Sequence, residues 1–147
     1  MVESFQFSIE AMRDHFVKSV LQHNNAADKL NAFVEAFLQL SEGKPLAGGC
    51  PIFNAAIEMD DLEGNVLLPT IHEAMDMMIN SLVKIIEAGI RNQELKQSIK
   101  PYDTAIYIVS TLEGGLVLDR LKKDRQLTRI IVNNLEQFIA MIATERQ

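Results

Sequence analysis

The segment "PYDTAIYIVSTLEGGLVLDRLKK", residues 101–123, predicts a helix whose apolar side chains point in most directions instead of along one stripe. These side chains are Ile106, Ile108, Val109, Leu112, Leu116, Val117 and Leu118. A helix that is apolar on every side has to be covered on every side. In a short chain, one way to achieve this is to pack the helix both on its own domain and on a partner.

Two successive glycines, Gly114 and Gly115, lie in the middle of this predicted helix. Each costs roughly 0.5–1 kcal/mol relative to alanine inside a helix. The pair is explained if another backbone approaches the helix closely at this point. The alternative is a weak spot that the helix tolerates, and the sequence leaves both explanations open.

Apolar residues at helical spacing run through nearly the whole chain and predict an all-α fold. The predicted helices cover residues 3–22, 25–41, 52–59, 65–89, 101–123 and 125–144. Asn25 and Asn65 stand where they can cap the second and fourth of these helices, and Pro69 is tolerated in a first turn. There are no internal repeats and no strong strand alternation, so residues 1–147 are predicted to form one domain of about six helices.

The composition restricts the possible partners. The 147-residue chain has a formal charge of −6, and an acidic chain repels phosphate, so we do not expect it to bind nucleic acid by itself. The one basic cluster, Arg120, Lys122, Lys123 and Arg125, lies where a helix should end, and cations are favourable there. No apolar run is long enough to cross a bilayer, and no signal segment begins the chain. The single cysteine fits a reducing compartment, so a cytoplasmic protein is expected.

The sequence offers little catalytic chemistry. Cys50 is the one cysteine, and none of the three histidines lies in a motif that would pair with it. His72 and Asp76 lie one turn apart, but two ligands do not make a metal site. No glycine-rich phosphate loop or Cys-x-x-Cys motif is present. We therefore expect no catalytic residue, no metal and no cofactor, and a small helical enzyme using Cys50 or a carboxylate cluster is the alternative.

Aromatic and methionine side chains recur on several predicted helices and are candidates for the lining of a ligand pocket, because flexible thioethers suit an adaptable wall. The candidate pocket residues are Phe16, Phe33, Phe37, Phe53, Met75, Met78, Tyr107 and Thr111. The same spacing also fits a plain core without a cavity, which would make the chain a pocketless helical adaptor. Periodicity alone does not decide between these two readings.

Several segments resemble the regulatory domain of TetR-family transcriptional repressors. "GGCPIFNAAIEMDD" (residues 48–61) is similar to that family's Gly-Cys-Pro segment, which small apolar residues and acids follow. "SLVKIIEAGIRNQEL" (81–95) resembles the end of its long helix, and "AIYIVSTLEGGLVLDRLKKD" (105–124) resembles its Leu-Glu-Gly helix and the turn before a last amphipathic helix. The resemblance covers residues 1–144. The family's amino-terminal helix-turn-helix is absent from the sequence, which indicates a truncated regulatory domain or, as the alternative, a naturally headless protein.

The resemblance implies a ligand-sensing and dimerisation domain that releases operator DNA when a small molecule binds. The apolar candidate lining, with few charges, suggests a hydrophobic or aromatic effector. DNA would be contacted only through the missing amino-terminal head. The last two helices would pair with their copies in a homodimer as a four-helix bundle. The residues that this implies for the interface are Leu112, Gly114, Gly115, Leu116, Leu118, Ile131, Leu135, Phe138 and Ile142.

Overall fold

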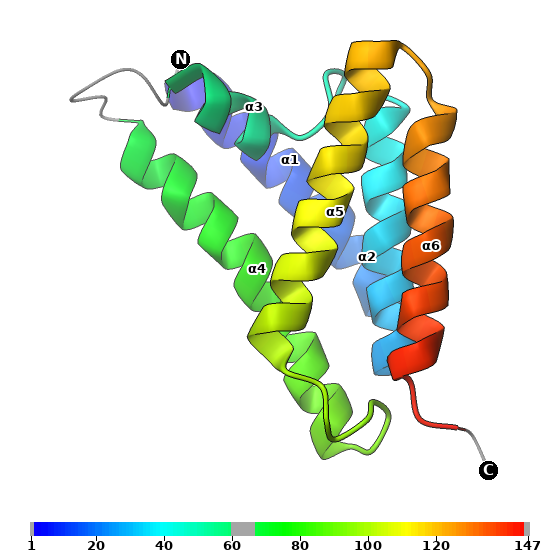
Figure 1. Cartoon of the computed structure of the whole chain (residues 1–147). Helices are drawn as coiled ribbons and strands as arrows, with labels where there is room; N and C mark the ends of the chain where they lie inside the picture. The colour runs from blue at the N-terminus through cyan, green and yellow to red at the C-terminus, as the bar shows by residue number, and fades with distance from the viewer. Residues whose placement is uncertain (1, 60–66, 146–147) are drawn as a thin grey trace.

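The computed structural model describes residues 2–59 and 67–145 and is built of helices (Figure 1). The described residues form α1 (Val2–Leu21), α2 (Ala26–Ser41), α3 (Pro51–Met59), α4 (Leu68–Arg91), α5 (Pro101–Lys122) and α6 (Gln126–Ile142). Within these residues, the one β-type contact is an isolated bridge between Leu95 and Ala143. The prediction of an all-α chain with six helices is confirmed. None of the helices in the described part is long and apolar enough to span a membrane.

The core lies where α2 and α5 meet the helices around them. α5 packs against α4 on one side and α6 on the other, and α2 contacts α1, α4, α5 and α6 (Figure 1). The largest fully buried side chains come from α2, α4, α5, α6 and the turn after α4: Leu30, Val34, Phe37, Leu40, Ile71, Leu82, Ile86, Leu95, Ile108, Leu112, Leu135 and Ile139. The all-round apolar character of α5 is thus largely used inside the chain itself.

The helix starts follow the expected local chemistry in two of three places. The Asn25 side chain accepts a hydrogen bond of 2.8 Å from the Ala27 N–H, so the predicted cap of α2 is confirmed. Pro101 opens α5, where a missing N–H costs nothing. The predicted cap of α4, Asn65, lies outside the described residues. In the described part, α4 starts at Leu68 with Pro69 in its first turn, later than an Asn65 cap would place it.

The turn between α4 and α5 fastens three parts of the chain together. Gly89 lets α4 approach α2 so closely that an added Cβ would lie 2.6 Å from the Cβ of Ala26. The Glu94 carboxylate accepts a 2.9 Å hydrogen bond from the Ala26 N–H, at the first residue of α2. Leu95 is fully buried, and the Thr144 N–H donates to the Glu94 carbonyl at 3.0 Å. This end of the bundle is therefore closed.

Candidate functional site

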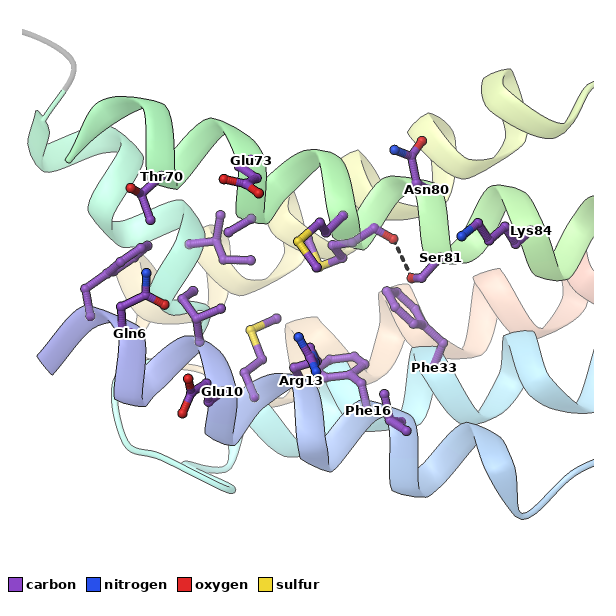
Figure 2. A pocket seen from close by; sticks show the side chains of 18 residues that line it. Gln6, Glu10, Arg13, Phe16, Phe33, Thr70, Glu73, Asn80, Ser81 and Lys84 are labelled. Atoms are coloured by element: carbon purple, nitrogen blue, oxygen red, sulfur yellow. Dashed lines mark hydrogen bonds between the residues drawn. The ribbon is translucent and has the colours of Figure 1, made fainter. Parts of the chain in front are cut away.

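A cavity of about 570 Å³ lies between α1 and α4, with contributions from α2 and α3 (Figure 2). We call it the α1–α4 cavity. Its wall is mainly apolar, and the apolar residues that line it are Phe5, Ile9, Met12, Phe16, Val17, Phe33, Ile52, Ala74, Met77 and Met78. Phe5, Met12 and Phe16 recur at intervals of seven and four along α1, so they share the face of that helix that is turned toward the cavity.

An aromatic cluster closes one end of the α1–α4 cavity. The ring of Phe16 lies 4.9 Å from that of Phe33 and 5.3 Å from that of Phe37, centroid to centroid, at tilted and edge-on angles. Such geometries are favourable between aromatic rings. Figure 2 shows Phe16 on α1 and Phe33 on α2 at the same end of the cavity. The cluster fixes the shape of this end, where Phe16 and Phe33 present apolar aromatic surface to the cavity.

Polar side chains stand at the rim of the same cavity. Figure 2 shows Gln6, Glu10, Thr70 and Glu73 toward one end and Arg13, Asn80, Ser81 and Lys84 toward the other. Most of these side chains are exposed to solvent. The Ser81 hydroxyl is already engaged, because it donates to the Met78 carbonyl at 2.6 Å. The cavity thus combines an apolar floor with a hydrophilic mouth, an arrangement typical of small-molecule sites.

The structure gathers only part of the predicted pocket. Phe16, Phe33 and Met78 lie in the wall of the α1–α4 cavity. Phe37 is fully buried behind them and does not line the cavity. Met75, partly buried against the core, is also outside the wall.

The three other predicted pocket residues lie elsewhere. Phe53 lines a different cavity, described below. Tyr107 is on the outer side of α5, where its ring lies 4.9 Å from that of Phe138. Thr111 stands one turn further along α5, and its hydroxyl donates to the Tyr107 carbonyl at 2.6 Å. The turn of α5 carries these two side chains away from α1, so they are left out of the candidate site.

Most of the apolar wall residues that sequence reasoning missed come from α1. Phe5, Ile9 and Met12 belong to the apolar stripe that predicted the first helix. Their helical spacing was visible, but nothing in the sequence distinguished them from core residues. Met77 was not predicted because the adjacent Met78 lies closer to the centre of the apolar stripe of α4 and was chosen instead.

A second cavity, of about 900 Å³, lies between the end of α2, the 42–50 loop, α3 and α5. We call it the α3–α5 cavity. Glu113 and Cys50 stand in its wall, and both are buried. Burial raises the pKa of the Glu113 carboxyl from 4.5 to about 7. Burial, together with the neighbouring Glu113 carboxyl, also raises the pKa of the Cys50 thiol well above its ordinary value. A thiol with a raised pKa is a poor nucleophile, which argues against catalysis by Cys50.

The outer side of α5 and α6 carries an uncharged face. We call it the α5–α6 outer face and define it by Tyr107, Gly114, Leu118, Leu121, Ile131, Asn134, Phe138 and Met141. Intervals of three, four and seven residues place these positions on one side of each helix. Leu121 and Met141 are large apolar side chains that are 75% and 69% exposed.

The residues predicted for a dimer interface divide between this face and the interior. Leu112, Leu116, Leu135 and Ile142 are buried in the chain's own core. They offer a partner no surface, because the period of each helix turns them inward. Gly114 and Leu118 are exposed, while Ile131 and Phe138 are partly buried beside them. The candidate interface is therefore narrowed to the outer face.

The two central glycines have different surroundings. A Cβ on Gly115 would lie 3.1 Å from the Ile131 side chain of the same chain, so Gly115 allows α5 and α6 to pack closely. A Cβ on Gly114 would meet no atom within 4 Å. The sequence predicted the close approach of another backbone, whereas the close neighbour of Gly115 is the Ile131 side chain of the same chain. At Gly114 the helix surface is open.

Comparison with known proteins assigns the chain to a family. The model of the domain described as "Tetracyclin repressor-like, C-terminal domain" matches residues 26–135, most of the chain. The chain belongs to this family. No curated protein matches the sequence.

Two solved structures of TetR-like regulators share the fold. A TetR transcriptional regulator from Chloroflexus aurantiacus J-10-FL is 26% identical, with a TM-score of 0.90, over 97% of this chain and 71% of the other. A transcriptional regulator of the TetR family from Cytophaga hutchinsonii is 24% identical, with a TM-score of 0.87, over 97% of this chain and 70% of the other. The sequence-based assignment to the TetR family is therefore confirmed, and the domain is that of a transcriptional regulator.

The TetR-like assignment agrees with the chemistry of the site. The family and the structures that share its fold are transcriptional regulators, which are not enzymes. Among residues 2–59 and 67–145, no group of three His, Cys, Asp or Glu side chains is arranged to hold a metal ion. What the geometry offers is binding space, in two cavities and on one outer face.

Proposed function

We propose that this TetR-like domain senses a small hydrophobic or aromatic effector in the α1–α4 cavity. The observation that carries the proposal is the mainly apolar wall of this cavity, with the Phe16–Phe33 pair at one end. An apolar ligand that fills such a space removes both its own surface and the wall from water, which is favourable by about 25 cal/mol per Å². The exposed rim residues Arg13 and Lys84 suit an effector that carries a polar or anionic end.

Effector binding would act on DNA through α1. This helix supplies a large part of the cavity wall and is the segment nearest the amino terminus, where we propose that a DNA-binding head joins the domain. A ligand that prefers one spacing of α1 and α4 shifts the population toward that spacing. In a dimer, movement of α1 would displace two heads from successive major grooves and release the operator. Such a regulator acts in the cytoplasm, where its DNA lies.

The cavity is tested with a fluorescent naphthalene probe, 8-anilinonaphthalene-1-sulfonate, titrated into the folded chain. We expect saturable binding to the wild type and a loss of affinity of about tenfold or more in Ala74→Trp, whose indole fills the cavity. The control is Ala140→Trp, which places the same indole on the exposed side of α6. Equal affinity in all three proteins would reject the α1–α4 cavity as the site and favour a pocketless adaptor.

We further propose that the domain forms a homodimer through the α5–α6 outer face. In support, this face carries no charged residue among the eight that define it and exposes Leu118, Leu121 and Met141. Apolar exposure of this kind marks interaction surfaces. Two helices from each copy would then form a four-helix bundle around Gly114, where an open helix surface permits close approach.

Sedimentation at micromolar concentration tests the dimer. Leu118→Glu places an unpaired charge in the proposed interface, so we expect the variant to sediment as a monomer with an unchanged helical spectrum. Ala140→Glu is the matched control, because Ala140 is exposed about 100° around α6 from Met141. A wild-type monomer, or a dimer that both variants retain, would overturn this assignment.

A further inference from the structure

The α3–α5 cavity contains an enclosed carboxyl group that neither the proposed effector cavity nor the outer face uses. Glu113, in the middle of α5, is only 5% exposed and stands in the wall of this cavity. Neither of its carboxyl oxygens has a partner with the geometry of a full hydrogen bond among the described residues, and the donor that interacts with the carboxyl is the Cys50 thiol, which is a weak one. Leaving such a group without a strong partner in an apolar environment is costly, so this buried carboxyl points to a missing donor.

The other charged groups around the cavity do not supply that donor. The charged residues in its wall besides Glu113 are Glu42, Glu58, Asp119, Arg120 and Arg125. Asp119 accepts a 2.7 Å hydrogen bond from the Thr128 hydroxyl, and Arg120 donates to the Asn54 side chain at 3.0 Å. Glu42, Glu58 and Arg125 are exposed to solvent. Among the described residues, the enclosed Glu113 carboxyl is thus left with the weak Cys50 thiol as its neighbouring donor and lacks a strong one.

The rest of the wall is suited to an apolar body. Phe53 and Ile57 of α3 face the cavity from one side, and Leu116 and Val117 of α5 from the other. A ligand for this space therefore needs an apolar frame and an N–H or O–H donor that reaches the carboxyl. A cationic donor would bind the Glu113 carboxylate more strongly than a neutral donor, because charge-assisted hydrogen bonds are about twice as strong as neutral ones.

We propose that the α3–α5 cavity is a second ligand site that binds a small organic cation, an amine or amidine on an apolar frame, through the Glu113 carboxylate. The two N–H groups of an amidine match the two carboxylate oxygens. Both carboxylate oxygens of Glu113 are buried, so a ligand can reach them only if a side chain of the cavity wall changes its rotamer. This site is distinct from the α1–α4 cavity, whose wall does not include Glu113.

Calorimetric titration of the whole chain with benzamidine, and with its uncharged analogue benzamide, tests the proposal. We expect benzamidine to bind at least about tenfold more tightly than benzamide, and to lose about tenfold or more in affinity in Glu113→Gln. Burial raises the pKa of Glu113 to about 7. A bound cation lowers it again, so binding at pH 6.5 should release protons from the wild type and not from the variant. Titration in buffers of different ionisation enthalpy counts these protons.

Glu58→Gln is the matched control, because Glu58 is an exposed carboxylate at the same cavity and its loss should leave binding unchanged. If Glu113→Gln does not fold, Ile57→Trp replaces it, since an indole at this exposed position fills the cavity and leaves Glu113 intact. Benzamidine affinity that survives the variant tested would overturn the proposal. So would equal losses in Glu58→Gln, or no binding at about 10 mM benzamidine. Ala74 lines only the α1–α4 cavity and Glu113 only the α3–α5 cavity, so the variants test the two proposals separately.

Discussion

Glu113 gives the domain a pH dependence whose sign and size follow from its position in α5. Burial raises the pKa of this carboxyl from 4.5 to about 7, whereas the unfolded chain retains the ordinary value. Between these two values the folded protein keeps a proton that the unfolded chain releases, so the free energy of unfolding falls as the pH rises. The contribution of this pKa difference to the free energy of unfolding is fully present below pH 4.5 and lost above pH 7. It amounts to about 3 kcal/mol, at about 1.4 kcal/mol for each unit of pKa difference.

Glu113→Gln removes this titration and keeps the shape of the side chain. The wild type loses stability as the pH rises and the variant does not. From pH 5 to pH 8, we therefore expect the free energy of unfolding of the variant, relative to that of the wild type, to increase by about 2–3 kcal/mol. This corresponds to a relative shift of about 1 M in the urea midpoint. Urea unfolding of both proteins at equal concentration and several pH values measures this. The raised pKa of Glu136 is common to both proteins and cancels in the difference. A difference in stability that stays constant with pH would refute the reasoning.

Three further substitutions test the packing, each by urea unfolding against the wild type. Gly89→Ala should destabilise the fold by about 1–3 kcal/mol despite better helix propensity, because the new Cβ would lie 2.6 Å from that of Ala26; a gain in stability would contradict this close approach. Asn25→Ala should cost about 1 kcal/mol through the lost cap of α2, and no change would mean that the cap is dispensable. Thr128→Val should cost about 1–3 kcal/mol, because it leaves the buried Asp119 carboxyl without its 2.7 Å donor; an unchanged midpoint would show that water replaces the hydroxyl.

The helices were predictable because their signals are local. A stripe at helical spacing, Asn25 as a cap and Pro101 in a first turn each act within a few residues, so the sequence indicated α2 and α5 closely. The role of Gly115 was harder to assign. Its close neighbour is the side chain of Ile131, on another helix, and the sequence does not show which residue of the fold comes near.

The candidate site was less predictable, because a cavity is a property of the distance between helices. Phe33 and Phe37 are one turn apart on the same stripe, yet Phe33 lines the α1–α4 cavity and Phe37 is sealed in the core. The difference depends on how far α1 stands from α4, which no short window of sequence encodes. Glu113 was likewise hidden, since a glutamate in a helix is usually exposed and its burial depends on α3 and the 42–50 loop.

Because the end of the bundle near Gly89 is closed, α4 is held at its carboxyl end and can rotate about that end. Its last turns are fixed at Gly89 and by the turn that carries Glu94 and Leu95, whereas the part from Thr70 to Lys84 borders the α1–α4 cavity. Thr70, at the far end of that wall, lies nineteen residues from Gly89, or about 28 Å along the helix. Widening the cavity by about 1 Å at Thr70 thus needs a rotation of only about 2° around the fixed end. If the α1–α4 cavity binds effectors as proposed, a small angular adjustment of α4 would accommodate ligands of different thickness and leave the contacts at Ala26 almost unchanged.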